Sequence, residues 1–145
     1  NELRVALEEL LGAFDSAHFL TDYYGACENL HGHRWRVVAY LAQEDLQSEG
    51  AMRGMVLDFG VFKSKVRLLC SEFDHTFLVE EGSLKPATVE ALEGEGFSLK
   101  MLPFRTTAEN LARHFAERLI GDGLPVCQID LYETPNNCAS YYVGG

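Results

Sequence analysis

The segment Cys27-Glu-Asn-Leu-His31-Gly-His33 carries the residues whose types and spacing are best suited to chemistry. In a β-strand, residues i and i+2 project from the same face, so a strand here would aim the imidazoles of His31 and His33 at one point. Neutral imidazole is a common zinc ligand. Taken alone, an H-x-H pair is more often two partly exposed polar side chains, so a metal site requires further ligands.

His18, in the preceding segment, is a candidate third ligand if the two segments form a hairpin. Three histidines with an open fourth position make the catalytic type of zinc site, in which substrate or water completes the coordination shell. Cys27 could instead supply a fourth ligand. A structural zinc finger would need a second Cys/His pair at finger spacing, and a cupin-like site would need a Glu shortly after the H-x-H pair. The sequence has neither pattern.

Two acidic features stand elsewhere in the sequence. Asp74 precedes His75, and such a neighbour can fix the orientation and tautomer of an imidazole and raise its basicity. The alternative is a polar pair that simply ends a helix. Glu133 follows a predicted strand, where it is either solvated or accepts two parallel hydrogen bonds from a guanidine-like edge, such as the edge of a pterin.

The spacing of apolar residues predicts the elements that hold these groups. A strand is expected over residues 2–19, where apolar residues alternate with charged or small ones, and a second over 31–42, a run rich in β-branched and aromatic residues. A short extended segment is expected over 54–57. A helix is expected to begin after Asp58, whose carboxylate can accept the unpaired N–H groups of the first turn. Its apolar face consists of residues spaced by three and four: Phe59, Phe62, Val66, Leu69 and Phe73.

The second half of the chain begins with a predicted loop over residues 80–96, broken by glycines and a proline and with room for one helical turn, and a third strand over 97–104. Thr106 and Glu109 fit a capping box at the start of a second helix, which Gly121 would end. A fourth strand is expected over 126–132. The order of elements, with a hairpin first, indicates one α+β domain over residues 1–145 with antiparallel pairing.

The composition excludes several classes of partner. The chain has 145 residues and a net charge of −10, so a nucleic-acid or anionic-membrane binder, which needs a basic face, is not expected. No apolar run approaches the length of a membrane helix, and the first residues lack the features of a secretion signal. The cysteines fall in separate segments, and we expect them to be reduced thiols of a cytoplasmic protein: Cys27, Cys70, Cys127 and Cys138.

Six segments together resemble the 6-pyruvoyltetrahydropterin synthase family, which includes the 6-carboxytetrahydropterin synthases. CENLHGHRWRV resembles the family's C-x-x-x-HGH motif, and FDSAH resembles its first-strand histidine motif. GMVLDFGVFK is similar to the lead-in of its helix, and FDHTFL to its Asp-His motif. RTTAENLA resembles its second helix start, and YETPNNCASY its C-terminal Glu-Thr segment. The segments follow the family's order and span almost the whole chain.

This resemblance implies a tunnelling fold, in which an α+β subunit has a four-stranded antiparallel sheet with two helices on one face. In the family three subunits close a β-barrel, and two trimers commonly stack into a homohexamer. A closed barrel would remove the exposed edges of the sheet. We therefore expect a homo-oligomer with a small-molecule substrate, without a nucleic-acid partner and without membrane association.

The resemblance also implies a catalytic zinc ion with a base, a proton relay and a pterin anchor nearby. The metal ligands would be His18, His31 and His33. The catalytic residues would be Cys27 as general base, Asp74 and His75 as the relay, and Glu133, which also anchors the pterin. Thr106 and Thr107 are expected to contact the substrate.

The implied substrate is dihydroneopterin triphosphate, whose side-chain hydroxyl groups zinc would polarise so that neighbouring C–H protons become more acidic. The expected products are 6-carboxytetrahydropterin, acetaldehyde and triphosphate, in queuosine (7-deazaguanine) biosynthesis. One alternative is a 6-pyruvoyltetrahydropterin synthase, a lyase that eliminates triphosphate in tetrahydrobiopterin biosynthesis. Another is a pterin- or purine-binding tunnelling-fold protein without catalysis.

Overall fold

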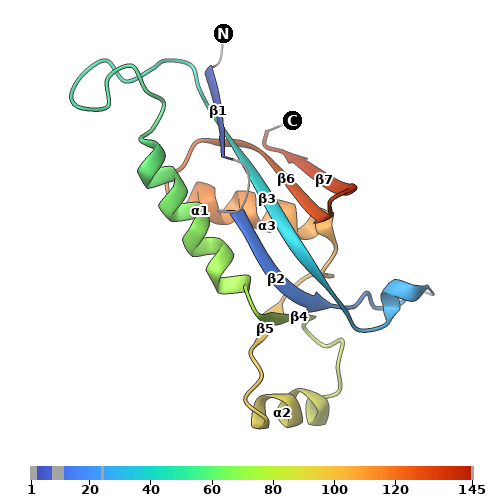
Figure 1. The fold of residues 1–145 in the computed structure, drawn as a ribbon. Helices are drawn as coiled ribbons and strands as arrows, with labels where there is room; N and C mark the ends of the chain where they lie inside the picture. Colours follow the sequence, from blue (N-terminus) through green and yellow to red (C-terminus); the bar gives the residue numbers. More distant parts are fainter. Residues whose placement is uncertain (1–2, 8–11, 24, 145) are drawn as a thin grey trace.

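A computed structural model describes residues 3–7, 12–23 and 25–144, which form a mixed sheet with three helices (Figure 1). The strands are β1 (Leu3–Leu7), β2 (Ala13–His18), β3 (His31–Gln43), β4 (Thr76–Glu80), β5 (Leu99–Leu102), β6 (Val126–Thr134) and β7 (Asn137–Tyr142). The helices are α1 (Phe59–Phe73), α2 (Pro86–Gly94) and α3 (Ala108–Gly121), and a 3₁₀ turn, η2, spans Ala26–Glu28.

The sheet runs in the order β5-β4-β2-β3-β6-β7, and β1 also pairs with β3. The long strand β3 pairs antiparallel with β1, β2 and β6, and β6 pairs antiparallel with β7. Strands β4 and β5 extend this antiparallel part by parallel pairing, β4 to β2 and β5 to β4. The α+β class is confirmed, whereas the prediction of a four-stranded, wholly antiparallel sheet is wrong, because the described residues form seven strands.

Helices α1 and α3 cover one face of the sheet, whereas α2 lies apart from both at the connection between β4 and β5 (Figure 1). The space between the sheet and the two covering helices is filled by aromatic side chains. The ring of Phe14 on β2 lies 5.7 Å from that of Phe73 on α1 and 5.6 Å from that of Phe115 on α3. All three side chains are fully buried, so this cluster fixes both helices against β2.

The helix ends show how local chemistry positions these elements. Helix α1 begins where predicted, with the Asp58 carboxylate accepting a hydrogen bond from the Val61 N–H at 3.1 Å. Helix α3 is capped by Thr107, which accepts from the Asn110 N–H at 3.2 Å, so the predicted capping box at Thr106 is wrong by one residue. The helix ends at Gly121 as predicted, but the left-handed C′ position is held by Gly123, at φ +88°, and not by Gly121.

Several elements differ from the sequence prediction. The expected loop over residues 80–96 contains helix α2, which starts with Pro86 and buries no side chain, so it has no apolar spacing to detect. Strands β4 and β7 were not predicted, and the extended segment expected over 54–57 is a turn and irregular chain. The strand expected over 2–19 is seen as β1 and β2, and residues 8–11 between them lie outside the described part.

In the part of the chain that the structure describes, no helix combines the length and the apolar character needed to cross a bilayer. The four cysteines, Cys27, Cys70, Cys127 and Cys138, have free thiols. Burial, helped by the charge of Asp74, raises the pKa of the Cys70 thiol to about 12. Cys70 is therefore a protonated member of the core at neutral pH rather than a reactive group.

Candidate metal centre

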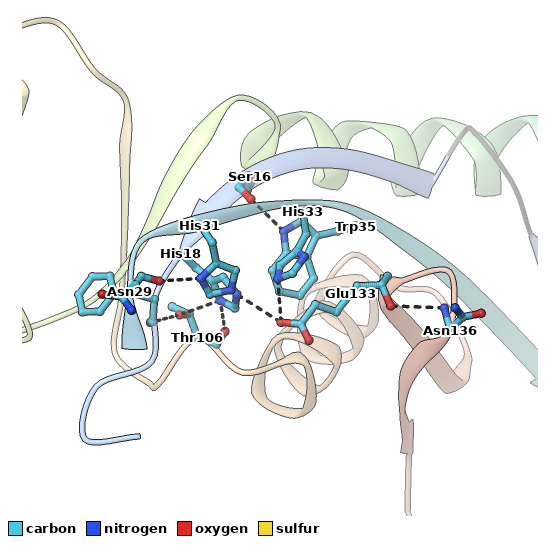
Figure 2. A network of polar contacts seen from close by, with 11 residues as sticks. Ser16, His18, Asn29, His31, His33, Trp35, Thr106, Glu133 and Asn136 are labelled. Atoms are coloured by element: carbon cyan, nitrogen blue, oxygen red, sulfur yellow. Dashed lines mark hydrogen bonds and ion pairs between the residues drawn. The ribbon is translucent and has the colours of Figure 1, made fainter. Parts of the chain in front are cut away.

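Strands β2 and β3 bring three histidines together at one end of their ladder. His18, the last residue of β2, pairs with His31, the first residue of β3, and His33 lies two positions further along β3. The ring centroid of His18 lies 4.6 Å from that of His31 and 5.2 Å from that of His33, and the two β3 rings are 4.8 Å apart (Figure 2). The predicted hairpin therefore forms and gathers the three predicted ligands.

Backbone carbonyl groups orient two of these rings. Nδ1 of His18 lies 2.8 Å from the carbonyl oxygen of Thr106, and Nδ1 of His31 lies 2.7 Å from that of Asn29 (Figure 2). A carbonyl can only accept, so each Nδ1 carries the proton and each Nε2 keeps a free lone pair. This is the usual arrangement around protein-bound metals, in which an outer acceptor fixes the tautomer of the ligating imidazole.

The three Nε2 atoms fit a bound cation. Those of His18, His31 and His33 are buried and have no hydrogen-bond partner among the described residues. They and a carboxylate oxygen of Glu133 all lie within 4.8 Å of one another. Buried polar atoms without partners are uncommon and destabilising. A metal ion bound among the three lone pairs would satisfy all of them at once, so the donor set suits a metal of the zinc class.

Glu133, on β6, approaches this cluster from the neighbouring strand. Its Oε1 lies 3.2 Å from Nε2 of His18 and 3.3 Å from Nε2 of His33 (Figure 2). The contact with His18 lowers the pKa of Glu133 most strongly, burial opposes this, and the proximity of the His33, His18 and His31 side chains adds to the lowering. The carboxylate is therefore ionised at neutral pH and adds one negative charge to the three imidazoles.

The resemblance implied that Glu133 lies near the metal ligands, but no local sequence pattern indicated that its carboxylate would contact the histidines. Its position follows from the pairing of Arg36 on β3 with Tyr132 on β6, which brings the next residue of β6 alongside the ligand end of β3. That register joins segments about a hundred residues apart, and no local pattern encodes it. The available signals were an acidic residue at a strand end and the resemblance of the segment around Glu133 to a family motif.

Burial lowers the pKa of His33, the charges of His18 and His31 act in the same direction, and the Glu133 carboxylate opposes them. The neutral imidazole is thus favoured, which is the form that binds a metal. Trp35 lies behind the cluster, fully buried, with its ring centroid 5.0 Å from that of His18 and 5.4 Å from that of His33. Its indole excludes water from the inner side of the site.

The pair Asp74 and His75 has the geometry of an oriented imidazole. Nδ1 of His75 lies 3.0 Å from Oδ2 of Asp74, and the His75 side chain is 79% exposed. A hydrogen bond from the backbone of Asp15 is the main cause that lowers the pKa of Asp74, and the contact with His75 adds to it. His33 and His75 line the same surface cavity of about 420 Å³, which links one member of the pair to one member of the histidine cluster.

The other predicted site residues have separate surroundings. Cys27 lies in η2, in the connection between the two ligand-bearing strands, and is half-buried. Within the described residues its thiol forms no hydrogen bond to the histidines or to the Asp74 carboxylate. Thr106 contacts His18 directly, through its carbonyl and, at 3.4 Å, its hydroxyl, whereas Thr107 caps α3.

Comparison with known proteins gives consistent matches over most of the chain. A family model described as 6-pyruvoyl tetrahydropterin synthase matches residues 11–143. A protein of Haemophilus influenzae named 6-carboxy-5,6,7,8-tetrahydropterin synthase is 35% identical over 135 residues, covering 89% of this chain and 93% of that protein. A Synechocystis protein of the same name is 32% identical over 117 residues, covering 74% of this chain and 91% of that protein.

Solved structures share the fold. A 6-pyruvoyltetrahydropterin synthase from Plasmodium vivax with a substituted catalytic residue superposes with a TM-score of 0.72 at 21% identity, covering 97% of both chains. An uncharacterised protein from Wolinella succinogenes superposes with a TM-score of 0.74 at 19% identity, covering 99% of both chains. At these identities the similarity establishes the arrangement of the strands and helices, and the chemistry has to be argued from the site.

Proposed function

The chain belongs to the 6-pyruvoyl tetrahydropterin synthase family, and we propose that it acts as a zinc-dependent 6-carboxy-5,6,7,8-tetrahydropterin synthase. The substrate would be dihydroneopterin triphosphate, and the products 6-carboxytetrahydropterin, acetaldehyde and triphosphate. The observation that carries the proposal is the convergence of three imidazole Nε2 atoms, none with a hydrogen bond among the described residues, beside the Glu133 carboxylate in a family of pterin enzymes. The choice of the carboxy product is supported by the names of relatives that are 30–35% identical.

We propose His18, His31 and His33 as the zinc ligands, each through Nε2. A bound zinc ion would supply Lewis acidity, polarising an oxygen of the substrate side chain and acidifying the adjacent C–H group. The carbonyl acceptors on Nδ1 of His18 and His31 keep these imidazoles in the ligating tautomer. The Trp35 indole lowers the local dielectric constant on the inner side, which strengthens electrostatic effects at the reacting atoms.

Proton transfer is assigned to residues on both sides of the histidines. Cys27 would take a proton from the substrate, because a thiolate near a cationic centre is a competent base at neutral pH. His75, held by Asp74 through Nδ1, has its other ring nitrogen available for exchange with substrate or solvent. In the proposed mechanism Asp74 stabilises the protonated form of His75 without itself being protonated, in keeping with its lowered pKa.

The pterin would be recognised by Glu133, whose ionised carboxylate can accept two parallel hydrogen bonds from the 2-amino group and the ring N–H. Its present contacts with His18 and His33 mean that it would have to turn from the cluster toward the ring when substrate binds. Thr106 and Thr107 would contribute substrate contacts from the start of α3. Thr106 has a second role in this proposal, because its carbonyl also orients His18.

A cavity of about 410 Å³ beside the metal centre could accommodate part of the substrate. His33 and Glu133 line it at one end, and Arg34 and Arg36 line it further along β3. Its size falls within the range of ~300–1,000 Å³ that is usual for small-molecule sites. The Arg34 guanidinium forms an ion pair with Asp15 at 3.0 Å. In a chain with a net charge of −10, the positive charge of the cavity that would suit a triphosphate therefore comes from Arg36.

We propose that the protein forms a homohexamer built from two trimers, each closed as a β-barrel. Strands β5 and β7 end the sheet on its two sides in a single chain, and strand pairing between subunits would cover such edges. The four free thiols fit a reducing compartment, and we propose that the protein works in the cytoplasm.

The proposed function is tested by incubating the zinc-loaded protein with dihydroneopterin triphosphate and identifying the products by mass spectrometry. A 6-carboxy pterin formed together with acetaldehyde is the expected result. A 6-pyruvoyl product would assign the chain to the other activity of the family with the same residues. A protein that binds zinc and forms its oligomer, but produces neither product, would contradict the proposed substrate.

A further inference from the structure

The turn that carries Asp74 and His75 is bound on both sides by the backbone of Asp15 in β2. The Asp15 N–H donates to Oδ1 of Asp74 at 2.8 Å, and the Asp15 carbonyl oxygen accepts from the N–H of His75 at 2.7 Å. These bonds connect the turn to the strand that ends in His18. The placement of the Asp74–His75 pair is therefore coupled to the sheet and not only to the end of α1.

Two hydroxyl groups hold the residue that precedes the pair. The Thr76 hydroxyl donates to the carbonyl oxygen of Phe73 at 2.6 Å, and the Ser16 hydroxyl donates to the same oxygen. Ser16 and Thr76 are register partners in the parallel pairing of β2 with β4, and Ser16 is 5% exposed. The Phe73 carbonyl, which α1 leaves without a helical partner, is thus satisfied from both sides.

His75 depends on this support for its orientation. It has a φ of +56°, a left-handed conformation that a non-glycine residue adopts only when its surroundings hold it there. Its imidazole is 79% exposed, so packing contributes little to the direction of the ring, and Nδ1 pairs with Asp74 at 3.0 Å. The direction of the ring is therefore set by the Asp74 contact together with the backbone of the turn that carries both residues.

We propose that Ser16 and Thr76 are positioning residues of the reaction: their hydroxyls fix the Phe73 carbonyl, and through it the left-handed turn that presents His75. This inference rests on the proposed function, in which His75 transfers protons. It assigns Ser16 and Thr76 no contact with substrate. Both residues lie in the wall of the cavity that His33 and His75 share, so a loosened turn would displace His75 within that space.

The activity test uses Thr76→Val, which keeps the shape of the side chain but removes its hydroxyl, and Ser16→Ala. Each variant is expected to lower kcat roughly tenfold, a part of the ~10²–10⁴ that a positioned acid or base supplies, while zinc content and KM stay close to wild type. Thr76→Ser, which retains the hydroxyl, should restore most of the rate. Thr88→Val, on exposed helix α2, is the matched control and should leave the rate unchanged.

A double-mutant cycle with His75→Ala separates positioning from a general structural effect. If Thr76 acts through His75, adding Thr76→Val to His75→Ala should change kcat less than about twofold. An equal loss in both backgrounds would overturn the proposal, and so would a wild-type rate for Thr76→Val and Ser16→Ala. A wild-type rate for His75→Ala alone would instead remove His75 from the proposed mechanism, and the positioning role would fall with it.

A second measurement needs no substrate. The Cε1–H resonance of His75 in the NMR spectrum is identified by its loss in His75→Ala. In Thr76→Val it should move toward the position found in an unstructured peptide, whereas the signals of His18, His31 and His33 should stay in place. An unmoved His75 signal would show that the hydroxyl does not hold the turn.

Discussion

His18 and His31 face each other as the last registered pair of strands β2 and β3, with their ring centroids 4.6 Å apart. Each ring has its Nδ1 on a backbone carbonyl and its Nε2 directed at the same point. The convergence of the imidazoles is therefore a property of the hairpin ladder, and His33, on the same face of β3, completes the cluster.

The first prediction concerns the metal. His31→Ala should weaken zinc binding by more than the ~10–100-fold that loss of an outer hydrogen-bond partner typically causes, because a ligand itself is removed. Metal content after dialysis against a weak chelator, measured by atomic emission, checks this. His75→Ala is the control, since its exposed ring lies outside the cluster, and it should retain zinc. Full metal content in His31→Ala would refute the proposed ligand set.

The second prediction tests the proposed base. Cys27→Ala should fold and bind zinc like the wild type but turn over at least ~10²-fold more slowly, the usual contribution of general base catalysis. Single-turnover kinetics with dihydroneopterin triphosphate provide the measurement. Cys138→Ala removes an exposed thiol on β7 and should keep the wild-type rate. Equal rates for the two variants would exclude Cys27 from the mechanism.

The third prediction separates two roles of Glu133. If Glu133 anchors the pterin, Glu133→Ala should raise the Kd of a pterin ligand, with zinc binding reduced far less than in His31→Ala. Loss of a charged hydrogen-bond partner of this kind typically costs about 1–3 kcal/mol, or roughly 5- to 150-fold in affinity. Calorimetry with a non-reactive pterin measures the Kd, and metal analysis of the same sample measures the zinc content. A variant that loses its zinc and binds pterin normally would assign Glu133 to the metal.

The fourth prediction is a pH dependence of stability. His114 on α3 lies between the rings of Phe73 and Phe104, and its buried Nε2 has no hydrogen-bond partner among the described residues. Burial lowers the pKa of His114 below its ordinary value of 6.5; the charges of Arg118 and Lys100 act with it, and those of Glu117 and Glu72 oppose it. Unfolding therefore takes up a proton as the pH falls below about 6.5, and the free energy of unfolding decreases.

The substitution His114→Phe removes this proton uptake and keeps the aromatic packing. Relative to wild type, the variant should gain stability steadily as the pH is lowered from about 7 to 5, while at pH 8 the difference should not vary with pH. Urea unfolding of both proteins at several pH values, with zinc present throughout, provides the comparison. Contributions from the other histidines are common to both proteins and cancel. If the difference in the free energy of unfolding between the two proteins stays constant across this pH range, the lowered pKa of His114 is contradicted.

The fifth prediction concerns a close approach of two backbones. A Cβ on Gly12, just before β2, would overlap the carbonyl oxygen of Val37 on β3. Gly12→Ala should therefore destabilise the fold by about 1–3 kcal/mol, the usual cost of overpacking. Gly121→Ala is the matched control, since a Cβ there meets no atom within 4 Å, and it should change stability by less than about 0.5 kcal/mol. Similar unfolding midpoints for the two variants would refute this close contact.

The parts of the structure that sequence analysis predicted correctly are those encoded by local patterns. The Asp58 cap, the apolar face of α1 and the β-rich run of β3 each depend on neighbouring residues. The structure contains all three, except that Phe59, predicted on the apolar face, is 51% exposed at the start of α1. The convergence of His18 with His31 and His33 followed from a single assumption, that the two segments form a hairpin. That assumption is confirmed by the β2–β3 register.

The parts that sequence analysis missed depend on contacts between distant segments. Helix α2 packs no side chain into the core, so its sequence lacks a helical apolar pattern, and Pro86 was read as a loop residue. Strand β7 exists because β6 offers a partner along its length, although its own sequence, NCASYY, alternates weakly. The position of Glu133 beside the histidines depends in the same way on the β3–β6 register.

Trp35 is the single tryptophan of the chain, and its ring contacts the imidazoles of His18 and His33. Its intrinsic fluorescence therefore arises from one buried indole adjacent to two of the proposed ligands. Any change in the protonation or metal loading of those imidazoles alters the electric field and the quenching that this indole experiences. The unlabelled protein thus contains its own optical reporter, whose emission can be titrated with metal ions one equivalent at a time.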